Sequence, residues 1–196
     1  MGHTLIGSHT SPYVRKLRLV MHNRVAYEFK TINYLEENDA LFLNKINPIN
    51  KIPVFLDGED PIYDSRVIYN YLVSKYQWKP LTLKEENYLS AIDGAMDTAI
   101  NLFSLKRGGL DLDTPNTYLT RQKDRIPQIL DYLKPWVIKL RPENAADWNF
   151  ASMSLYSFLY WANFREVIAI DLYPEMKKFL FDFKNNPGVQ ETTIIV

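Results

Sequence analysis

Three short polar segments of the chain carry the residue types that could bind a small ligand and activate it. The first, residues 7–16, holds the hydroxyl-rich run Ser-His-Thr-Ser ahead of a proline. The second, residues 47–54, reads Asn-Pro-Ile-Asn-Lys-Ile-Pro-Val, and the third, residues 63–66, reads Tyr-Asp-Ser-Arg. Hydroxyls, a lysine and a carboxylate in this order and at this spacing favour a site for a small anionic peptide that carries a thiol.

The first segment places Ser11 directly before Pro12, which suits the first turn of a helix because its missing N–H costs nothing there. A helix N-terminus leaves backbone N–H groups free and carries a positive partial charge, so it can hold an anion. A hydroxyl at that point can also donate a hydrogen bond to a thiolate. Helix capping would select the same serine without any chemistry, and Ser8 and Thr10 are close enough to be rivals for the chemical role.

Three basic side chains belong to the same segment. His9 is interpreted as an exposed loop residue rather than a catalytic base. Arg15 and Lys16 could add positive potential at the helix N-terminus, and a solvated helix face is the alternative interpretation.

The second segment contains the dipeptide Ile52-Pro53 at the head of a predicted strand. X-Pro bonds are the ones that adopt the cis form at modest cost. A cis bond here would turn the backbone N–H and C=O of Ile52 outward, where an extended peptide could pair with them as an added strand. An ordinary trans proline ahead of an edge strand is the alternative, and composition does not separate the two.

The third segment, Asp64-Ser65, precedes another helical pattern. Both residues are good helix caps, so capping alone explains them. The functional interpretation adds a second helix N-terminus directed at a ligand.

These segments are joined by alternating strand and helix patterns over the first 78 residues. Apolar and β-rich runs predict strands, helical spacing predicts helices, and an Asp-Gly turn predicts a hairpin. The predicted strands are residues 4–8, 27–33, 52–56 and 61–63, and the predicted helices are residues 12–22, 36–44 and 65–76. This β-α-β, β-β-α order is that of a thioredoxin-like domain.

Strand patterns largely disappear after a linker at residues 77–83. Pro127 and Pro135 should kink or split one of the helices that follow, and the almost wholly apolar stretch 150–161 should be a buried central helix. The predicted helices are residues 84–106, 117–140, 150–161 and 173–185, with a loop at residues 141–148. The predicted fold class is therefore α/β followed by all-α.

The order and spacing of the three segments resembles the N-terminal domain of cytosolic glutathione S-transferases. The resemblance covers the whole chain and is strongest over residues 4–76. The run Gly-Ser-x-Thr-Ser-Pro-aromatic-Val-Arg-Lys, with a later Asn-Phe-Arg, is most similar to a bacterial subgroup of serine-type members. The resemblance implies a thioredoxin-like glutathione-binding domain at residues 1–78, a linker at 79–84, and an all-helical domain at 85–196 that forms an electrophile pocket.

The resemblance also implies how glutathione, the co-substrate, is held. The backbone of Ile52, ahead of a cis Pro53, reads the cysteinyl unit, and Lys51 reaches the glycyl carboxylate. Ser65 holds the γ-glutamyl carboxylate, and Asp64 meets the α-ammonium group. Family members more often carry Glu before the serine, so Asp64 departs from the pattern by one methylene.

The activity that the resemblance implies is that of a glutathione transferase. Ser11 matches the catalytic serine of serine-type members, which stabilises the glutathione thiolate for attack on a small hydrophobic electrophile. The predicted pocket residues are Tyr13, Tyr34, Tyr88, Met96 and Trp161, and plain core packing would account for each of them as well. A glutathione-dependent peroxidase, or a non-catalytic binding or scaffold protein of the same fold, is the alternative. The resemblance further implies a homodimer.

Composition excludes several other classes of function. Lys+Arg and Asp+Glu both number 23, which argues against a dedicated nucleic-acid binder. The absence of cysteine excludes disulfides and a protein thiol nucleophile, and three histidines without metal-ligand spacing make a metal site unexpected. No apolar run reaches the ~18 residues of a membrane span, and no secretory signal is visible. We therefore expect a cytoplasmic protein with no nucleic-acid or membrane partner.

Overall fold

The computed structural model describes residues 2–33 and 35–194. The chain forms two compact units, of which one is Met1–Pro80 together with Pro187–Val196 and the other is Leu81–Asn186. Among the described residues, no helix combines the length and the apolar character that crossing a membrane requires.

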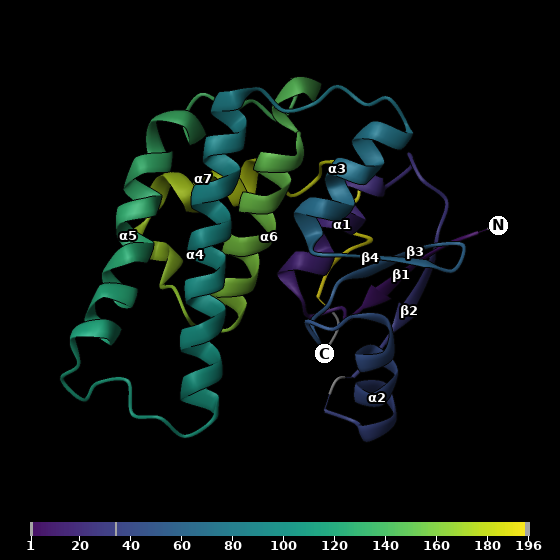
Figure 1. The fold of residues 1–196 in the computed structure, drawn as a ribbon. Coiled ribbons are helices and arrows are strands. Elements are labelled where there is room, and N and C mark those ends of the chain that lie inside the picture. Colours follow the sequence, from purple (N-terminus) through teal and green to yellow (C-terminus); the bar gives the residue numbers. More distant parts are fainter. Residues whose placement is uncertain (1, 34, 195–196) are drawn as a thin grey trace. The chain divides into compact units, whose positions relative to one another are not determined.

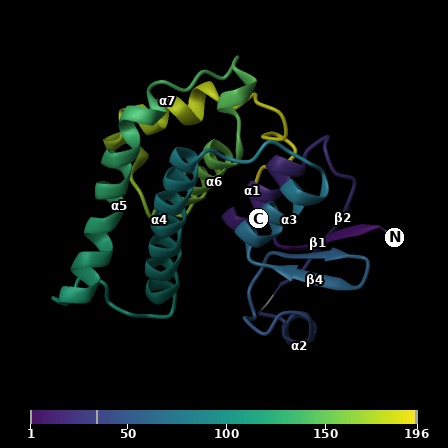
Figure 2. The same cartoon turned by 45° about the horizontal axis from the view of Figure 1, so that its top comes forward.

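The first unit is built on a four-stranded sheet in the order β2-β1-β3-β4. β1 runs parallel to β2, whereas the β1–β3 and β3–β4 pairs are antiparallel. Helices α1 and α3 cover one face of the sheet and α2 covers the other (Figures 1 and 2). The predicted thioredoxin-like order is confirmed. The elements are β1 (His3–Gly7), α1 (Pro12–Met21), β2 (Glu28–Thr31), α2 (Glu37–Ile46), β3 (Val54–Asp57), β4 (Asp60–Tyr63) and α3 (Ser65–Lys75).

Apolar side chains hold the sheet between its helices. Ile6 and Val54 pack with Leu43 of α2 in one buried cluster. Leu5 and Phe55, which are neighbours in register, are fully buried as well. Because successive side chains of a strand point to opposite faces, this second pair supports the face that carries α1 and α3.

The end of β1 lies very close to α1. A Cβ atom added to Gly7 would lie 2.4 Å from Cγ2 of Val14, which is closer than real side-chain atoms approach. The glycine therefore sets the distance between the strand and the helix that follows it.

The second unit is built from helices. α4 packs against both α5 and α6, and α7 also contacts α5 and α6. Most of α6 is buried, including Phe150, Phe158 and Leu159, as the apolar stretch predicts. The helices are α4 (Leu83–Arg107), α5 (Thr117–Val137), α6 (Phe150–Phe164) and α7 (Pro174–Asp182), with short 3₁₀ turns at Ala145–Asp147 and Ile170–Leu172.

The sequence predicts that the two internal prolines kink or split α5, and the structure shows no split. Pro127 and Pro135 both lie inside one continuous helix. A proline removes one helical hydrogen bond and crowds the preceding turn. Here Ile126, Leu130 and Leu133 form a buried apolar face that spans the first proline and reaches nearly to the second, and this packing outweighs the local cost.

The end of the chain is a second correction. The sequence pattern assigns residues 85–196 to the helical domain, but Pro187–Val196 groups with the first unit. Its described part lies beside α1, where the yellow C-terminal segment passes the purple helix in Figure 1. A local sequence pattern does not predict the contact between the C-terminal segment and α1, because the residues that meet are far apart in the sequence. Arg15 and Val189, for example, are separated by 174 positions.

Candidate functional site

The sheet register brings the three polar segments together at one end of the strands, where β1 and β4 finish and β3 begins. Ile6 of β1 pairs with Val54 of β3, and Val54 pairs with Tyr63 of β4. The first segment follows β1, the second directly precedes β3, and the third directly follows β4. Neighbouring strands lie about 4.8 Å apart, so the three strands span roughly 10 Å. An extended tripeptide has about that length. We call this end of the strands, with residues 8–11, 51–53 and 64–65, the Ser11 end.

Ser11 is the N-cap of α1, as predicted. Its Oγ accepts a hydrogen bond from the backbone N–H of Val14, with a distance of 3.3 Å between N and Oγ. A hydroxyl has one proton to donate and two lone pairs, so Ser11 can cap the helix and still donate to a ligand. The rival hydroxyls of Ser8 and Thr10 lie 3.1 Å apart and bond each other.

The Ile52–Pro53 peptide bond is cis, as the resemblance implies. Lys51 is exposed beside it, and Ile52 is half-buried. Asn47, which is buried, organises this loop: its Nδ2 donates to the Lys51 carbonyl at 2.6 Å, and its Oδ1 accepts from the Ile49 N–H at 3.0 Å. Asn47 is not among the predicted site residues, although an Asn before a Pro is a turn signal that could have identified it.

Asp64 caps α3 with an unusual backbone. Its φ of +71° is rare for a residue with a side chain, and such outliers cost of order 1–3 kcal/mol. Its Oδ1 accepts hydrogen bonds from the N–H groups of Arg66 (2.8 Å) and Val67 (3.4 Å). Ser65, the first residue of α3, is buried. The cap thus uses one carboxylate oxygen of Asp64 and leaves Oδ2 outside these two bonds.

The basic residues of the first segment do not lie as the sequence suggested. His9 is half-buried rather than exposed, and its ring stands edge-on to Phe29 with 5.0 Å between ring centroids. Burial and the neighbouring Arg18 guanidinium lower the pKa of His9 below its usual 6.5. Arg15 and Lys16 are both buried, so a solvated helix face does not describe them.

The predicted electrophile-pocket residues fall in different parts of the chain. Tyr34 lies outside the described residues. Tyr13 is half-buried on α1, with Nζ of Lys16 5.1 Å from its ring centroid. Tyr88, Met96 and Trp161 are buried in the helical unit. There Tyr88 stacks on Trp136 and Trp161 packs edge-on against Phe103.

A pocket of about 570 Å³ lies within the helical unit, between the end of α5, residues 138–143 and α7. None of the predicted site residues lines it. Within residues 2–33 and 35–194, no group of three or more His, Asp or Glu side chains is arranged to hold a metal ion.

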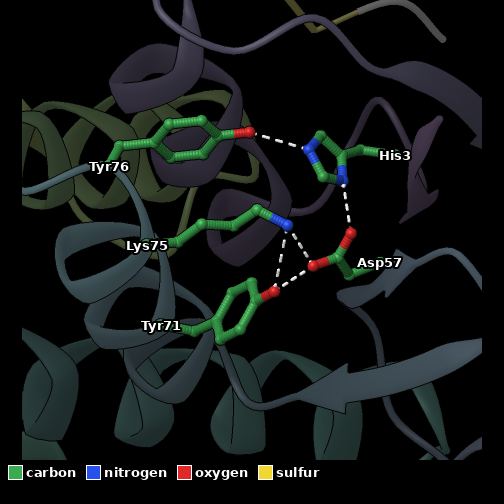
Figure 3. A network of polar contacts seen from close by, with 5 residues as sticks. All are labelled: His3, Asp57, Tyr71, Lys75 and Tyr76. Carbon is green, nitrogen blue, oxygen red and sulfur yellow. Dashed lines mark hydrogen bonds and ion pairs between the residues drawn. The ribbon is translucent and has the colours of Figure 1, made fainter. Parts of the chain in front are cut away.

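The opposite end of the strands carries a network of polar side chains, which we call the His3 end (Figure 3). Nε2 of His3 lies 2.7 Å from the Tyr76 hydroxyl, and its Nδ1 lies 3.1 Å from Asp57. The other carboxylate oxygen of Asp57 accepts from the Tyr71 hydroxyl and from the Lys75 ammonium. Hydrogen bonds from Lys75, then Tyr71, lower the pKa of Asp57 below 3.8.

Comparison with known proteins shows what the first unit is similar to. The family model described as "Glutathione S-transferase, N-terminal domain" matches residues 5–80, which make up most of that unit. An uncharacterised glutathione-transferase-like protein of Escherichia coli K12, YibF, is 29% identical over 175 residues, and the match covers 83% of each chain.

Solved structures share the fold of the whole chain. A glutathione S-transferase from Methylobacillus flagellatus, determined with glutathione bound, has a TM-score of 0.82 at 20% identity and covers 99% of this chain and 100% of its own. A glutathione transferase family member from Pseudomonas fluorescens Pf-5, also with bound glutathione, has a TM-score of 0.77 at 26% identity, with both chains covered completely. The architecture is therefore that of glutathione transferases.

Proposed function

We propose that the protein is a glutathione S-transferase of the serine type, in which the Ser11 end binds glutathione and stabilises its thiolate. The observation that carries the proposal is the register that aligns Ile6, Val54 and Tyr63. It brings two helix N-termini and the Lys51–Pro53 loop to one end of the strands, over a length that suits an extended tripeptide. Relatives determined with bound glutathione support the choice of ligand.

The proposed chemistry follows from Ser11 and the α1 N-terminus. The glutathione thiol, with an ordinary pKa near ~8.5, is largely protonated at neutral pH. The helix dipole and a donated hydroxyl proton both favour the anion. Each unit by which the thiol pKa falls corresponds to ~1.4 kcal/mol of differential stabilisation. The thiolate then attacks a small hydrophobic electrophile.

The remaining contacts divide glutathione among the other two segments. The backbone of Ile52 pairs with the cysteinyl unit, and Lys51 meets the glycyl carboxylate. Ser65 and the α3 N-terminus bind the γ-glutamyl carboxylate, while Asp64 meets the α-ammonium group with the oxygen that lies outside the cap. The strained φ of Asp64 supports a role in binding, because such strain concentrates at ligand sites.

The same thiolate would serve reduction of organic hydroperoxides, so peroxidase activity is the second candidate. Thiol–disulfide exchange through a protein thiol is disfavoured because the chain has no cysteine. A non-catalytic scaffold is the third candidate. A cytoplasmic location, with its supply of reduced glutathione, and a homodimeric state complete the proposal.

Calorimetric titration with glutathione tests the proposal, using the wild type, Ser65→Ala and Ser74→Ala. Ser74 is exposed near the opposite end of the same helix and provides the matched control. We expect the wild type to bind. Loss of a charge-assisted contact should weaken binding to Ser65→Ala by about 5- to 150-fold, with Ser74→Ala unchanged. No binding by the wild type at millimolar glutathione would leave only the scaffold candidate.

A further inference from the structure

We propose that the C-terminal segment, residues 187–194, holds the α1 N-terminus and its loop in the position from which Ser11 stabilises the glutathione thiolate. Arg15 and Arg18 are the positioning residues. This inference rests on the proposed function and adds to it a part of the chain that lies far from the three polar segments in sequence.

Arg15 provides the first attachment. It is a buried cation on α1, one helical turn after Ser11. Its Nε donates to the Thr192 hydroxyl (3.3 Å), and a terminal guanidinium nitrogen donates to the Val189 carbonyl (3.2 Å). The backbone N–H of Arg15 in turn donates to the Ser11 carbonyl at 3.0 Å. The C-terminal segment therefore fixes a residue that is bonded directly to the cap.

Arg18 provides the second attachment and reaches the loop itself. One of its terminal nitrogens donates to the Glu191 carbonyl at 2.8 Å. Another lies 3.3 Å from Nδ1 of His9, and the guanidinium carbon is 4.7 Å from the Phe29 ring centroid. His9 is two residues from Ser11. One guanidinium thus joins the C-terminal segment to the loop whose conformation sets the direction of the Ser11 hydroxyl.

The segment has a defined path along α1. Gly188 lies beside His22, where an added Cβ would come within 3.0 Å of the imidazole-bearing side chain, and its φ is +84°. Four residues later, Thr192 lies beside Arg15, and its N–H closes a turn on the Gly188 carbonyl at 3.0 Å. The segment thus runs from the end of α1 towards its beginning. Loosening the segment would free the helix start by fractions of an ångström, a displacement that matters for a hydroxyl–thiolate contact.

Point variants of the segment test this inference without touching the proposed site. Thr192→Val removes the hydroxyl that Arg15 binds and keeps the shape of the side chain, and Thr192→Ser restores the hydroxyl. Gly188→Ala perturbs the segment at its other end. Thr193→Val is the matched control, because the Thr193 hydroxyl bonds only within the segment, to the Val189 carbonyl.

Two readouts separate positioning from mere stability. The ultraviolet absorption of the thiolate, followed against pH, gives the pKa of bound glutathione. The Kd of S-methylglutathione, which has no thiol to ionise, reports the remaining contacts. We expect Thr192→Val and Gly188→Ala to raise the pKa of bound glutathione by about 0.3 to 1 unit, which is a two- to tenfold change in its ionisation constant. The Kd of S-methylglutathione should stay within about twofold, and Thr192→Ser and Thr193→Val should match the wild type.

The outcomes distinguish this inference from the proposed function. If the wild type binds neither glutathione nor S-methylglutathione, the proposed function fails and this inference fails with it. If both bind, but the thiol pKa is unchanged in Thr192→Val and Gly188→Ala, only the positioning role is overturned. A parallel loss of S-methylglutathione affinity and thiolate fraction would also overturn it, because that pattern indicates general loosening of the unit.

Discussion

The two ends of the same sheet use the same elements for opposite purposes. β1 contributes Gly7 to the Ser11 end and His3 to the other, and α3 contributes Ser65 to the first and Lys75 to the second. At the His3 end, the polar side chains bond mainly to one another. At the Ser11 end, the side chains of Ser11 and Asp64 instead accept hydrogen bonds from the backbone and cap α1 and α3.

This difference shows how a small domain combines stability with binding. The contacts of the His3 end join side chains of the protein to one another. A helix N-terminus, in contrast, carries a positive partial charge that can also act on a bound anion. The strained backbone of Asp64 lies at the Ser11 end, and the close approach of β1 to α1 at Gly7 lies directly beside it.

The largest effect is expected for Gly7→Ala at the Ser11 end. The added Cβ would overlap the Val14 side chain, so strand and helix must move apart. Overpacking of this kind costs about 1–3 kcal/mol, which lowers Tm by roughly 2–12 °C in a chain of this size. Thermal unfolding of Gly7→Ala, Val14→Ala and the double variant measures it. The double variant should recover part of the loss; strict additivity would contradict the proposed overlap.

Ser11→Ala should have the next largest effect, on turnover. Loss of the donated proton should raise the pKa of bound glutathione by about one unit, so kcat/KM near neutral pH falls about tenfold. The lost cap should also cost roughly 1 kcal/mol of stability. Turnover of a panel of electrophiles at several pH values measures the first effect. Ser8→Ala is the matched control, and an equal loss in that variant would move the chemical role away from Ser11.

Local patterns were sufficient to predict most of the fold. The spacing of apolar residues gave the helices of both units, and the Asp-Gly turn gave the β3–β4 hairpin that aligns Tyr63 with Val54. α5 shows where such patterns fail. Its two prolines predict a kink or a split, but the helix is continuous and carries a buried apolar face across the first proline. Packing between distant segments is the information that a local pattern lacks.

The candidate site divides in the same way. Ser11 and Asp64 were identified as caps because a cap is a property of a few consecutive residues, and both caps are present. The buried state of Arg15 was missed because its partners are residues 189 and 192. The His3 network was missed for the same reason, since His3 and Asp57 meet only through the β1–β3 pairing.

Asp57→Asn perturbs the other side of the comparison, with a smaller effect on stability. The variant weakens the bonds from Lys75 and Tyr71 and should lower Tm by roughly 2–4 °C at pH 7. Because the folded pKa of Asp57 is depressed, its contribution is complete above the ordinary value of 3.8 and is lost as pH falls through the folded pKa. The variant should therefore lose less stability in acid than the wild type does.

The matched control for this variant is Asp60→Asn, because Asp60 pairs with Asp57 in register and is exposed. Glutathione binding, measured by calorimetry, should be unchanged in both variants, since the His3 end lies at the opposite end of the strands. A clear loss of affinity in Asp57→Asn alone would show that the two ends are coupled and that their separation is only apparent.

The smallest effect on stability is expected for a variant of His9, whose side chain titrates at higher pH than Asp57 does. Burial and Arg18 depress the pKa of His9 in the folded protein, so the unfolded chain takes up the proton first. Stability should therefore decline as pH falls below about 6.5 and level off below the folded pKa. His9→Asn places a neutral acceptor where Nδ1 faces Arg18, and this variant should show no such decline. Thermal unfolding between about pH 5 and 8 measures this decline in stability, because histidine changes charge over roughly that range. A decline that persists in His9→Asn would assign the titration to another group and would weaken the case that the Arg18 contact with His9 controls the Ser11 loop.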